Sequence, residues 1–360
     1  MPIYTIFGRR TYGRSTDFGI FSSGGRVILL SANGLMENRI ALIGYPARDT
    51  KRYPDGRVEE SLGGIMFGAL ALAALGREIG VRAIPVTTLG NDVAEKAREL
   101  LARAGCRMDA VRVVDAATQH SEITFTDANE RTETVSGALS PLGARDIASD
   151  ADAPWLTART IGVNFITGNE MSIDTFRLLR ERYTGPIVVD YHTLALGTDS
   201  GGRRFAYRRA DWAAWIGLAD VVQMNRSEAE TLAGYRLTRP EDAAAFAREL
   251  LHLGPRATVI TLADEGTVGA ERTDSGFRTY SVAATSPNGP VDTVGCGDVF
   301  HAALTLGWTH FAQLQPAMSL ANVAAGLHTG YAGLEGIDTL NRAWRMIASQ
   351  IATAEVPGNR

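Results

Sequence analysis

The sequence has very little lysine, and this scarcity excludes several classes of enzyme. Lys51 and Lys96 are the two lysines, against 34 arginines, and neither lysine follows a glycine. A phosphate-binding P-loop needs Gly-Lys followed by Ser or Thr, so the sequence does not contain one. Schiff-base enzymes need a placed lysine, for which there are only two candidates. A zinc hydrolase has little support, because the six histidines form no His-Glu-x-x-His pair.

Cysteine, long apolar runs and an excess of basic charge are also missing. Cys106 and Cys296 are too few for a disulfide framework, which favours a reducing cytoplasm. No apolar run reaches the roughly 18 residues of a membrane helix, and the N-terminus lacks the apolar core of a signal peptide. The formal net charge of −4 over 360 residues gives no basic footprint for nucleic acid. We therefore expect a cytoplasmic globular protein that binds neither nucleic acid nor membrane.

Strand and helix signals alternate along most of the chain. Apolar β-branched runs at 161–167, 187–190 and 257–262 are separated by stretches with helical periodicity. This alternation predicts the α/β class, as a three-layer α/β sandwich around a mostly parallel sheet. Two interrupting stretches, near 45–60 and 109–136, are expected to form a small β-lid over one sheet edge.

The first 35 residues differ in composition from the rest of the chain. They are rich in Gly, Ser, Thr and Arg and have no clear periodicity. We expect residues 1–35 to be an extension that is disordered or not native. Met36 leads within a few residues into the apolar strand Ile40–Gly44, as many cytosolic α/β chains begin. A single domain over residues 36–350 is therefore expected.

The most informative motif is Val291–Phe300, which reads VDTVGCGDVF. Gly295 and Gly297 flank Cys296 and lead into an apolar helix. Glycines before a helix let backbone N–H groups converge at the positive end of the helix dipole, which predicts an anion site. Asp298 lies in the first helical turn, where it is placed to act as a base; taken alone, a Gly-x-Gly-Asp is better explained by a stabilising cap. The motif is not a dinucleotide fingerprint, which needs three spaced glycines just after the first strand.

This motif resembles the Asp-Thr-x-Gly-Ala-Gly-Asp signature of the ribokinase/PfkB family of sugar kinases. Further matches, in the family's order, extend the resemblance over about residues 39–335. It implies a ribokinase-like fold and an ATP- and Mg²⁺-dependent kinase that phosphorylates a hydroxyl group of a sugar or nucleoside. The other matching segments are Gly63-Gly64, Gly90 to Asp92, Asn225-x-x-Glu228, Thr261-Leu262 with Gly266, and Asn322 with Ala324-Ala325.

The resemblance implies a role for each residue around the phosphoryl group. Asp298 would take the proton from the substrate hydroxyl, and Gly295, Cys296 and Gly297 would offer backbone N–H groups to the transferring phosphoryl. Cys296 replaces the family's alanine, which we expect to be tolerated. Because helix N-termini favour thiolates, we expect its pKa to be lowered and thiol reagents to inactivate the protein. The alternative is a buried small side chain, inert to such reagents.

The resemblance also implies residues that hold the metal and the nucleotide. Asn225 and Glu228 lie one helical turn apart and would orient the waters around Mg²⁺, with Asn225 also bordering the nucleotide. The alternative for this pair is a helix N-terminus with an early acid. Thr261 and Gly266 would shape the nucleotide pocket, and Asn322 would lie near the adenine. Asn322 is equally explained as a helix-surface amide.

On the substrate side, the resemblance covers fewer residues. Asp49, five residues after Gly44, would bind the substrate hydroxyls beside Gly63 and Gly64; the alternative is a solvated loop acid. Position 68 is glycine where many family members carry an asparagine that touches the sugar. The phosphoryl-transfer half therefore matches the family, while the sugar half is nonstandard.

Several alternatives remain open at this point. One is a sugar-phosphate kinase, in which Arg48, Lys51 and Arg52 would hold the phosphate. Another is a non-catalytic protein of the same fold that binds a sugar or a nucleotide. A monovalent cation near residues 292–294 and a homodimer formed through the lid are further features of the family that this sequence does not decide. Ala263 replaces a glycine that is usual in the family.

Overall fold

The structure is a computed structural model of the chain, and it describes residues 18–23, 26–31, 38–126, 131–148, 153–285 and 291–347. Its main feature is a nine-stranded sheet, in the order β17-β16-β15-β14-β11-β10-β3-β6-β7. The seven strands from β15 to β7 are parallel, and β16 and β17 form antiparallel pairs at one edge. The strands are β3 (Arg39–Ile43), β6 (Arg82–Gly90), β7 (Val111–Val114), β10 (Thr160–Asn164), β11 (Ile187–Asp190), β14 (Val221–Asn225), β15 (Ala257–Thr261), β16 (Thr267–Thr273) and β17 (Gly276–Val282).

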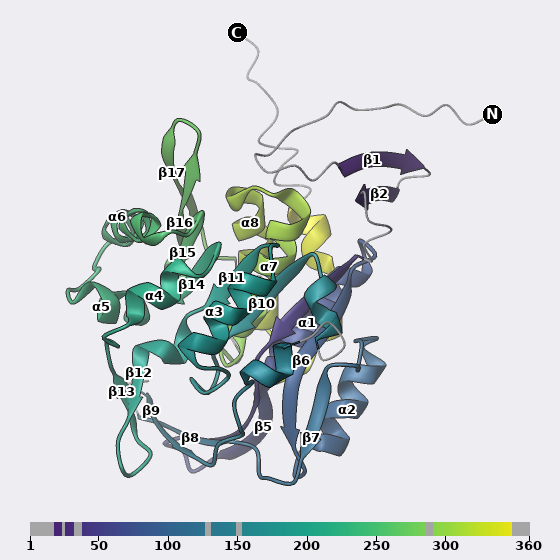
Figure 1. Cartoon of the computed structure of the whole chain (residues 1–360). Helices are drawn as coiled ribbons and strands as arrows, with labels where there is room; N and C mark the ends of the chain where they lie inside the picture. The colour runs from purple at the N-terminus through teal and green to yellow at the C-terminus, as the bar shows by residue number, and fades with distance from the viewer. Residues whose placement is uncertain are drawn as a thin grey trace.

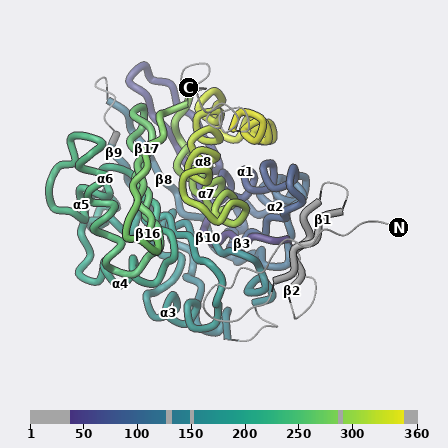
Figure 2. Tube along the Cα trace, turned by 90° about the horizontal axis from the view of Figure 1, so that it is seen from above, coloured from purple at the N-terminus to yellow at the C-terminus, as the bar shows by residue number. Residues whose placement is uncertain are grey.

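Helices cover both faces of this sheet, so the predicted three-layer α/β sandwich is confirmed (Figures 1 and 2). One apolar core forms under α1 (Ile65–Arg77), α2 (Ala94–Arg103), α7 (Cys296–Phe311) and α8 (Leu314–His328). The other forms under α3 (Ile173–Arg182), α4 (Trp212–Gly217), α5 (Arg226–Ala233) and α6 (Pro240–Leu250). Short 3₁₀ helices connect these elements at Ala144–Ile147, Pro154–Thr157, His192–Ala195, Leu251–Leu253, Ala263–Glu265 and Ile337–Thr339.

The helix α1 shows how composition sets position in this fold. Every residue from Ile65 to Gly76 is buried, because the helix is apolar on all sides and is enclosed by its neighbours. By contrast, α2 buries only Ala94, Ala97 and Leu101, which recur at helical spacing on one face. Among the described residues, no helix is both long and apolar enough to cross a membrane.

A second, four-stranded sheet with the order β5-β4-β8-β9 lies at one end of the molecule (Figure 1). We call it the lid sheet; its strands are β4 (Pro46–Arg52), β5 (Val58–Gly64), β8 (His120–Phe125) and β9 (Arg131–Ser136). The segment predicted as lid at 109–136 begins differently, because β7 extends the large sheet instead. The physical reason is the connection: β6, α2 and β7 form a parallel βαβ unit, which places β7 beside β6.

Two further pairs of strands form small sheets of their own. The strands β12 (Leu196–Thr198) and β13 (Arg204–Ala206) make one of them. The strands β1 (Phe18–Ser23) and β2 (Arg26–Ser31) make the other, within the predicted extension. The remaining residues of 1–35, and those of 348–350 at the end of the predicted domain, lie outside the described residues.

Candidate active site

The ends of neighbouring parallel strands bring several polar side chains to one edge of the large sheet. Asn164 ends β10, Asp190 ends β11, and Gln223 lies near the end of β14. All three are buried, although most other residues of their strands are apolar. The carboxyl ends of parallel strands are where α/β folds bind ligands. This edge, which faces the start of α7, is therefore the place to look for chemistry.

Asp298 is buried at this edge and held in place by a neighbouring strand. The Asn164 side chain donates a hydrogen bond from Nδ2 to Asp298 Oδ1 over 2.7 Å. Burial raises the pKa of Asp298 to about 7, the Glu228 carboxylate contributes to the rise, and the Asn164 hydrogen bond opposes it. A buried acid with a raised pKa, beside a helix start, has the properties of a proton acceptor.

The start of α7 supplies backbone donors beside Asp298. Gly295 caps the helix with φ 82°, a left-handed value, and a Cβ there would lie 2.5 Å from the Phe67 ring. A Cβ on Gly297 would meet no atom within 4 Å, so space is open at this position. Cys296 N–H already donates to the Thr293 carbonyl over 3.3 Å. The helix offers no acceptor to the next N–H groups, those of Gly297 and Asp298, which leaves them for an anion.

The thiol of Cys296 differs from the sequence-based prediction. Its pKa is raised to about 12, not lowered, mainly because its partly buried position disfavours the charged thiolate. The carboxylates of Asp292 and Asp298 add to the shift, and Lys51 opposes it. The predicted lowering of the thiol pKa is therefore wrong, because desolvation and two nearby negative charges favour the protonated thiol. A small, weakly reactive side chain is the alternative that this pKa favours.

Asp49 lies on the lid strand β4, not in a solvated loop. It is buried, and burial raises its pKa to about 7, with Glu133 and Asp298 contributing as like charges. A hollow of about 150 Å³ between the lid sheet and the start of α2 reaches Asp49. The lid sheet thus brings this carboxyl into the electrostatic field of Asp298, although the two residues are far apart in the sequence.

Two glycines of β5, Gly63 and Gly64, leave room for Asp49 and the start of β4 to pack closely against them. A Cβ on Gly63 would overlap the Asp49 carboxylate, and a Cβ on Gly64 would overlap the Tyr45 carbonyl. Gly64 also adopts φ 63°, which disfavours other residues. The pair Gly63-Gly64 is therefore required by close packing around Asp49. This packing is separate from any contact of the two glycines with a ligand.

Position 68 does not face the acceptor side. A Cβ on Gly68 would lie 2.9 Å from Leu42 Cδ2 and 3.4 Å from the Asp298 carbonyl oxygen. The residue is therefore directed into the packing between α1, the large sheet and α7. Glycine here allows the two helices to approach closely.

The three basic residues of β4 are each paired with a carboxylate. Arg48 Nη1 lies 3.2 Å from Asp92 Oδ2, and Arg52 Nε lies 3.0 Å from Glu122 Oε1. Lys51, in contrast to its neighbours, is buried, and its Nζ lies 2.6 Å from Asp292 Oδ2. None of the three is left unpaired to hold a substrate phosphate, so the structure does not favour that alternative.

The expected nucleotide side is built around the turn between β15 and β16. Thr261 ends β15 in register with Asn225 of β14. A Cβ on Gly266 would overlap the Val282 carbonyl, and Gly266 adopts φ 94°. Ala263 adopts φ 54°, a left-handed value that costs a non-glycine residue roughly 1 kcal/mol. That backbone conformation accounts for glycine being usual at this position.

Asn322 is buried on α8 and both ends of its amide are engaged. Its Nδ2 donates to the Ala283 carbonyl over 2.5 Å, and its Oδ1 accepts from Thr267 Oγ1 over 3.4 Å. Gly326, one helical turn later, has no room for a Cβ because the Thr285 carbonyl occupies that space. Asn322 is therefore not a helix-surface amide: it holds the segment after β17 against α8.

Asn225 and Glu228 form a reciprocal capping box at the start of α5. Glu228 N–H donates to Asn225 Oδ1 over 2.9 Å, and Asn225 N–H donates to Glu228 Oε2 over 2.8 Å. This is the helix N-terminus with an early acid that the sequence left as the alternative. The capping box does not exclude a metal role, because a carboxylate oxygen can also accept from a metal-bound water.

Oxygen atoms beside this capping box fit a hydrated Mg²⁺. Within the described part of the chain, Asn164 Oδ1, Asp190 Oδ2 and Gln223 Oε1 are buried without a hydrogen-bond partner. Burial and the nearby carboxylates of Glu228 and Asp298 raise the pKa of Asp190 well above its usual range. Mg²⁺ prefers oxygen donors and keeps several waters. The described residues contain no cluster of three His, Cys, Asp or Glu side chains able to hold a metal directly.

Sequence reasoning missed Asn164, Asp190 and Gln223 as site residues. The signal was present: each is a polar residue within or at the end of a largely apolar strand, where side chains are normally apolar.

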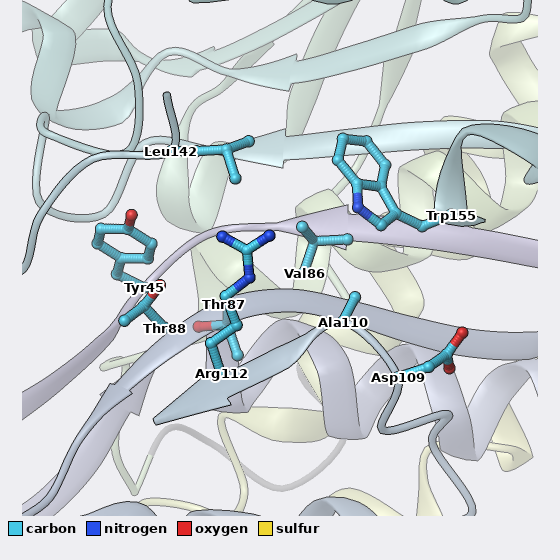
Figure 3. Close-up of a pocket in the computed structure, with 9 residues that line it drawn as sticks. All are labelled: Tyr45, Val86, Thr87, Thr88, Asp109, Ala110, Arg112, Leu142 and Trp155. Carbon is cyan, nitrogen blue, oxygen red and sulfur yellow. The ribbon is translucent and has the colours of Figure 1, made fainter. Parts of the chain in front are cut away.

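A separate cavity of about 30 Å³, room for about one water, is lined by Tyr45, Arg112, Trp155 and their neighbours (Figure 3). It contains none of the predicted site residues.

Comparison with known proteins supports a single family. The model of the pfkB family carbohydrate kinases matches residues 204–339. A cytidine kinase from Thermococcus kodakarensis is 23% identical over 283 residues, covering 78% of this chain and 92% of that protein. The structure of ribokinase from Giardia lamblia superimposes with a TM-score of 0.69 at 18% identity, covering 88% of this chain and 99% of that one. Ribokinase from Cryptococcus neoformans, in complex with ADP, gives 0.67 at 19% identity over 86% and 99%.

Proposed function

Because the chain belongs to the ribokinase/PfkB family of carbohydrate kinases, we propose that it transfers the γ-phosphoryl group of ATP to a hydroxyl group of a sugar or nucleoside. The observation that carries the proposal is Asp298. It is a buried acid with a pKa raised to about 7, oriented by Asn164 and placed beside the backbone donors of α7. The ADP bound in a similar ribokinase supports ATP as the donor.

In the proposed reaction, Asp298 acts as the general base. The substrate hydroxyl oxygen attacks the γ-phosphorus while its proton passes to the Asp298 carboxylate. The bond from the γ-phosphorus to the bridging oxygen breaks, and ADP leaves with that oxygen. A pKa near 7 suits this step, because the carboxylate is ionised in a large share of molecules yet remains basic enough to take the proton.

The other residues bind and orient the two substrates. Asp49, from the lid sheet, would accept hydrogen bonds from the acceptor's hydroxyl groups. The backbone N–H groups of Gly295 to Gly297 would stabilise the negative charge of the transferring phosphoryl, with Gly297 the best placed because its N–H has no helical acceptor. Thr261, Gly266 and the segment held by Asn322 would border the nucleotide.

Mg²⁺ would be held through its waters by Asn225 and Glu228, with Asp190 and Gln223 on the same side. When bound, the ion neutralises charge on the phosphate groups. The waters around it would also give hydrogen-bond partners to the buried oxygens of Asp190 and Gln223. This second effect stabilises the fold, since buried polar groups without partners destabilise it.

Two observations weigh against the alternatives. A sugar phosphate would need free basic residues, and the three basic residues of β4 are paired with carboxylates. A non-catalytic binding protein would not need a proton acceptor beside the backbone donors of a helix start, which is where Asp298 lies. A kinase acting on an unphosphorylated acceptor is the better fit.

The test is ADP release over a panel of acceptors. We would supply ATP and Mg²⁺ with sugars, nucleosides and the corresponding sugar phosphates, and repeat the leading acceptor with inorganic pyrophosphate as the donor. We expect turnover with ATP and an unphosphorylated acceptor. A strict preference for phosphorylated acceptors would support the sugar-phosphate alternative, while ATP binding without turnover on any acceptor would support a binding protein.

A further inference from the structure

A buried ion pair joins the lid sheet to the loop before α7. Lys51 of β4 is 1% exposed, and its Nζ lies 2.6 Å from Oδ2 of Asp292, a residue 241 positions later in the chain. The same carboxylate accepts from Val294 N–H at Oδ1 over 2.9 Å and from Gly333 N–H at Oδ2 over 3.3 Å. Asp292 is thus surrounded by one full positive charge and two backbone donors.

The choice of lysine at this position is itself informative. The chain has 34 arginines and two lysines, and the other lysine, Lys96, is exposed on α2. Arginine is the usual basic residue of this chain, yet the basic residue that is buried at position 51 is a lysine. Lysine differs by ending in a compact ammonium that acts as a point charge, whereas the guanidinium is broad and planar. A small, concentrated positive charge therefore lies in the buried position beside Asp292.

The resemblance to the family suggests a site for a monovalent cation near residues 292–294. The residues at this position do not fit such a site. A cation held by the Asp292 side chain would need a carboxylate oxygen that faces it. Both oxygens of Asp292 already accept hydrogen bonds from Lys51, Val294 and Gly333. An ion next to the Lys51 ammonium would also meet a like charge at close range.

We propose that the Lys51 ammonium takes the place of a bound monovalent cation, so that the loop carrying the anion site works without one. The inference rests on the proposed kinase function for its effect on turnover, but not for its structural part. Lys51 is a positioning residue: it neutralises Asp292, four residues before Cys296, and fixes the loop that leads into α7. Because Lys51 belongs to the lid sheet, the same contact ties the lid to this loop.

The first experiment varies the cation at constant ionic strength. Wild-type turnover should be the same in potassium chloride and in choline chloride. The turnover of Lys51→Ala in choline chloride should be at least about tenfold lower than that of the wild type, since a preorganised charge near the phosphoryl site is removed. Potassium or ammonium ions should restore a large part of it, because the substitution leaves space beside Asp292. Arg52→Ala is the matched control: it removes the next basic residue, which is 48% exposed and paired with Glu122, and should leave turnover unchanged.

A second measurement needs no activity and keeps the inference separate from the proposed function. The melting temperature of Lys51→Ala should rise in potassium chloride relative to choline chloride, while that of the wild type should not. The double variant Lys51→Ala/Asp292→Asn removes both charges and should show neither rescue nor a potassium-dependent melting shift. The proposal is overturned if the wild type is activated several-fold by potassium. It is also overturned if potassium fails to raise the melting temperature of Lys51→Ala. If no acceptor is phosphorylated, the melting series still decides it.

Discussion

The two ends of the candidate site treat their buried polar groups in opposite ways. At the strand ends beneath α7, Asp298 and Asp190 are buried carboxyls with raised pKa values, and Asp190 Oδ2 has no hydrogen-bond partner among the described residues. At the nucleotide side, Asn322 uses both ends of its amide within the protein. Asn225 and Glu228 likewise satisfy each other.

This difference separates chemistry from scaffolding. A buried polar group without a partner destabilises the folded state, so a cluster of such groups at the strand ends is where a ligand would gain most from binding. A buried polar group whose partners are all in the protein instead fixes the shape of the backbone. In the proposed function, the strand ends beneath α7 would meet the reacting groups, and the backbone that Asn322 holds would border the nucleotide.

Replacing Asp298 should abolish most of the turnover, and it has the largest expected effect. Asp298→Asn should lower turnover by at least about 10²-fold, in line with general-base contributions, while ATP still binds. ADP release would measure turnover, and calorimetry would measure ATP binding. The control is Asp174→Asn, on an α3 side chain that is 84% exposed. Near-normal turnover in a folded Asp298→Asn protein would reject the assignment.

The same substitution should stabilise the protein in a pH-dependent way. The folded-state pKa of Asp298 is about 7, above its ordinary value of 3.8, so folding favours the protonated form. That contribution is fully present below about pH 4 and is lost as the pH rises through 7. Asp298→Asn should therefore melt higher than the wild type at pH 8, and the difference should vanish near pH 4. A constant difference at all pH values would mean that the carboxyl is not buried.

The pH dependence of turnover gives the next largest effect. A base must be ionised, so a pKa of about 7 for Asp298 predicts that kcat/KM falls roughly tenfold per pH unit below 7. An ordinary exposed aspartate would keep its activity down to about pH 5. Initial rates between pH 5 and 9, with the fold monitored by circular dichroism, distinguish the two.

Glu228→Gln tests whether the satisfied capping box also serves the metal. Glutamine can still cap the helix, so stability should change little. Loss of the negative charge should raise the Mg²⁺ concentration for half-maximal rate by about tenfold, the usual scale for groups that act around a metal. Asp242→Asn, at the equivalent capping position of α6, is the matched control. An unchanged Mg²⁺ titration would make Glu228 a capping residue only.

Cys296→Ala should keep most of the activity, because the position needs a small side chain and contributes through its backbone. The raised pKa of the thiol, about 12, also predicts slow alkylation of the native wild type at pH 8. Mass spectrometry after treatment with iodoacetamide would measure the labelling of both cysteines. Rapid labelling of Cys296 in the folded protein would show that burial does not control this thiol.

The smallest effect is expected outside both ends of the site. A chain that starts at Met36 should melt and turn over like the full chain. The strands β1 and β2 within the removed segment form a sheet of their own, separate from the nine-stranded sheet. A fall of several degrees in melting temperature would mean that the segment stabilises the domain.

Local patterns in the sequence were sufficient for the architecture and for the start of α7. Periodicity identified the alternating strands and helices, and Gly295 to Asp298 lie together in the chain, so no tertiary information was needed to place them side by side. The contact between Asn164 and Asp298 spans 134 residues and depends on β10 lying beneath α7, which a single sequence does not reveal. The raised pKa of the Cys296 thiol was not foreseen, because it depends on charges that folding brings close. The direction in which position 68 faces depends on the rotational phase of a fully buried helix, which periodicity does not give.

The contact between Gly326 and Thr285 has a consequence for how this protein can change by mutation. Any Cβ at position 326 would overlap the Thr285 carbonyl, so only glycine fits at this position while residues 283–285 keep their present course. A lineage can exchange Gly326 only together with changes that re-route this segment, and re-routing would also free the amide of Asn322. Exchange of Gly326 is therefore expected to require coupled substitutions in the segment 283–285 that packs against it.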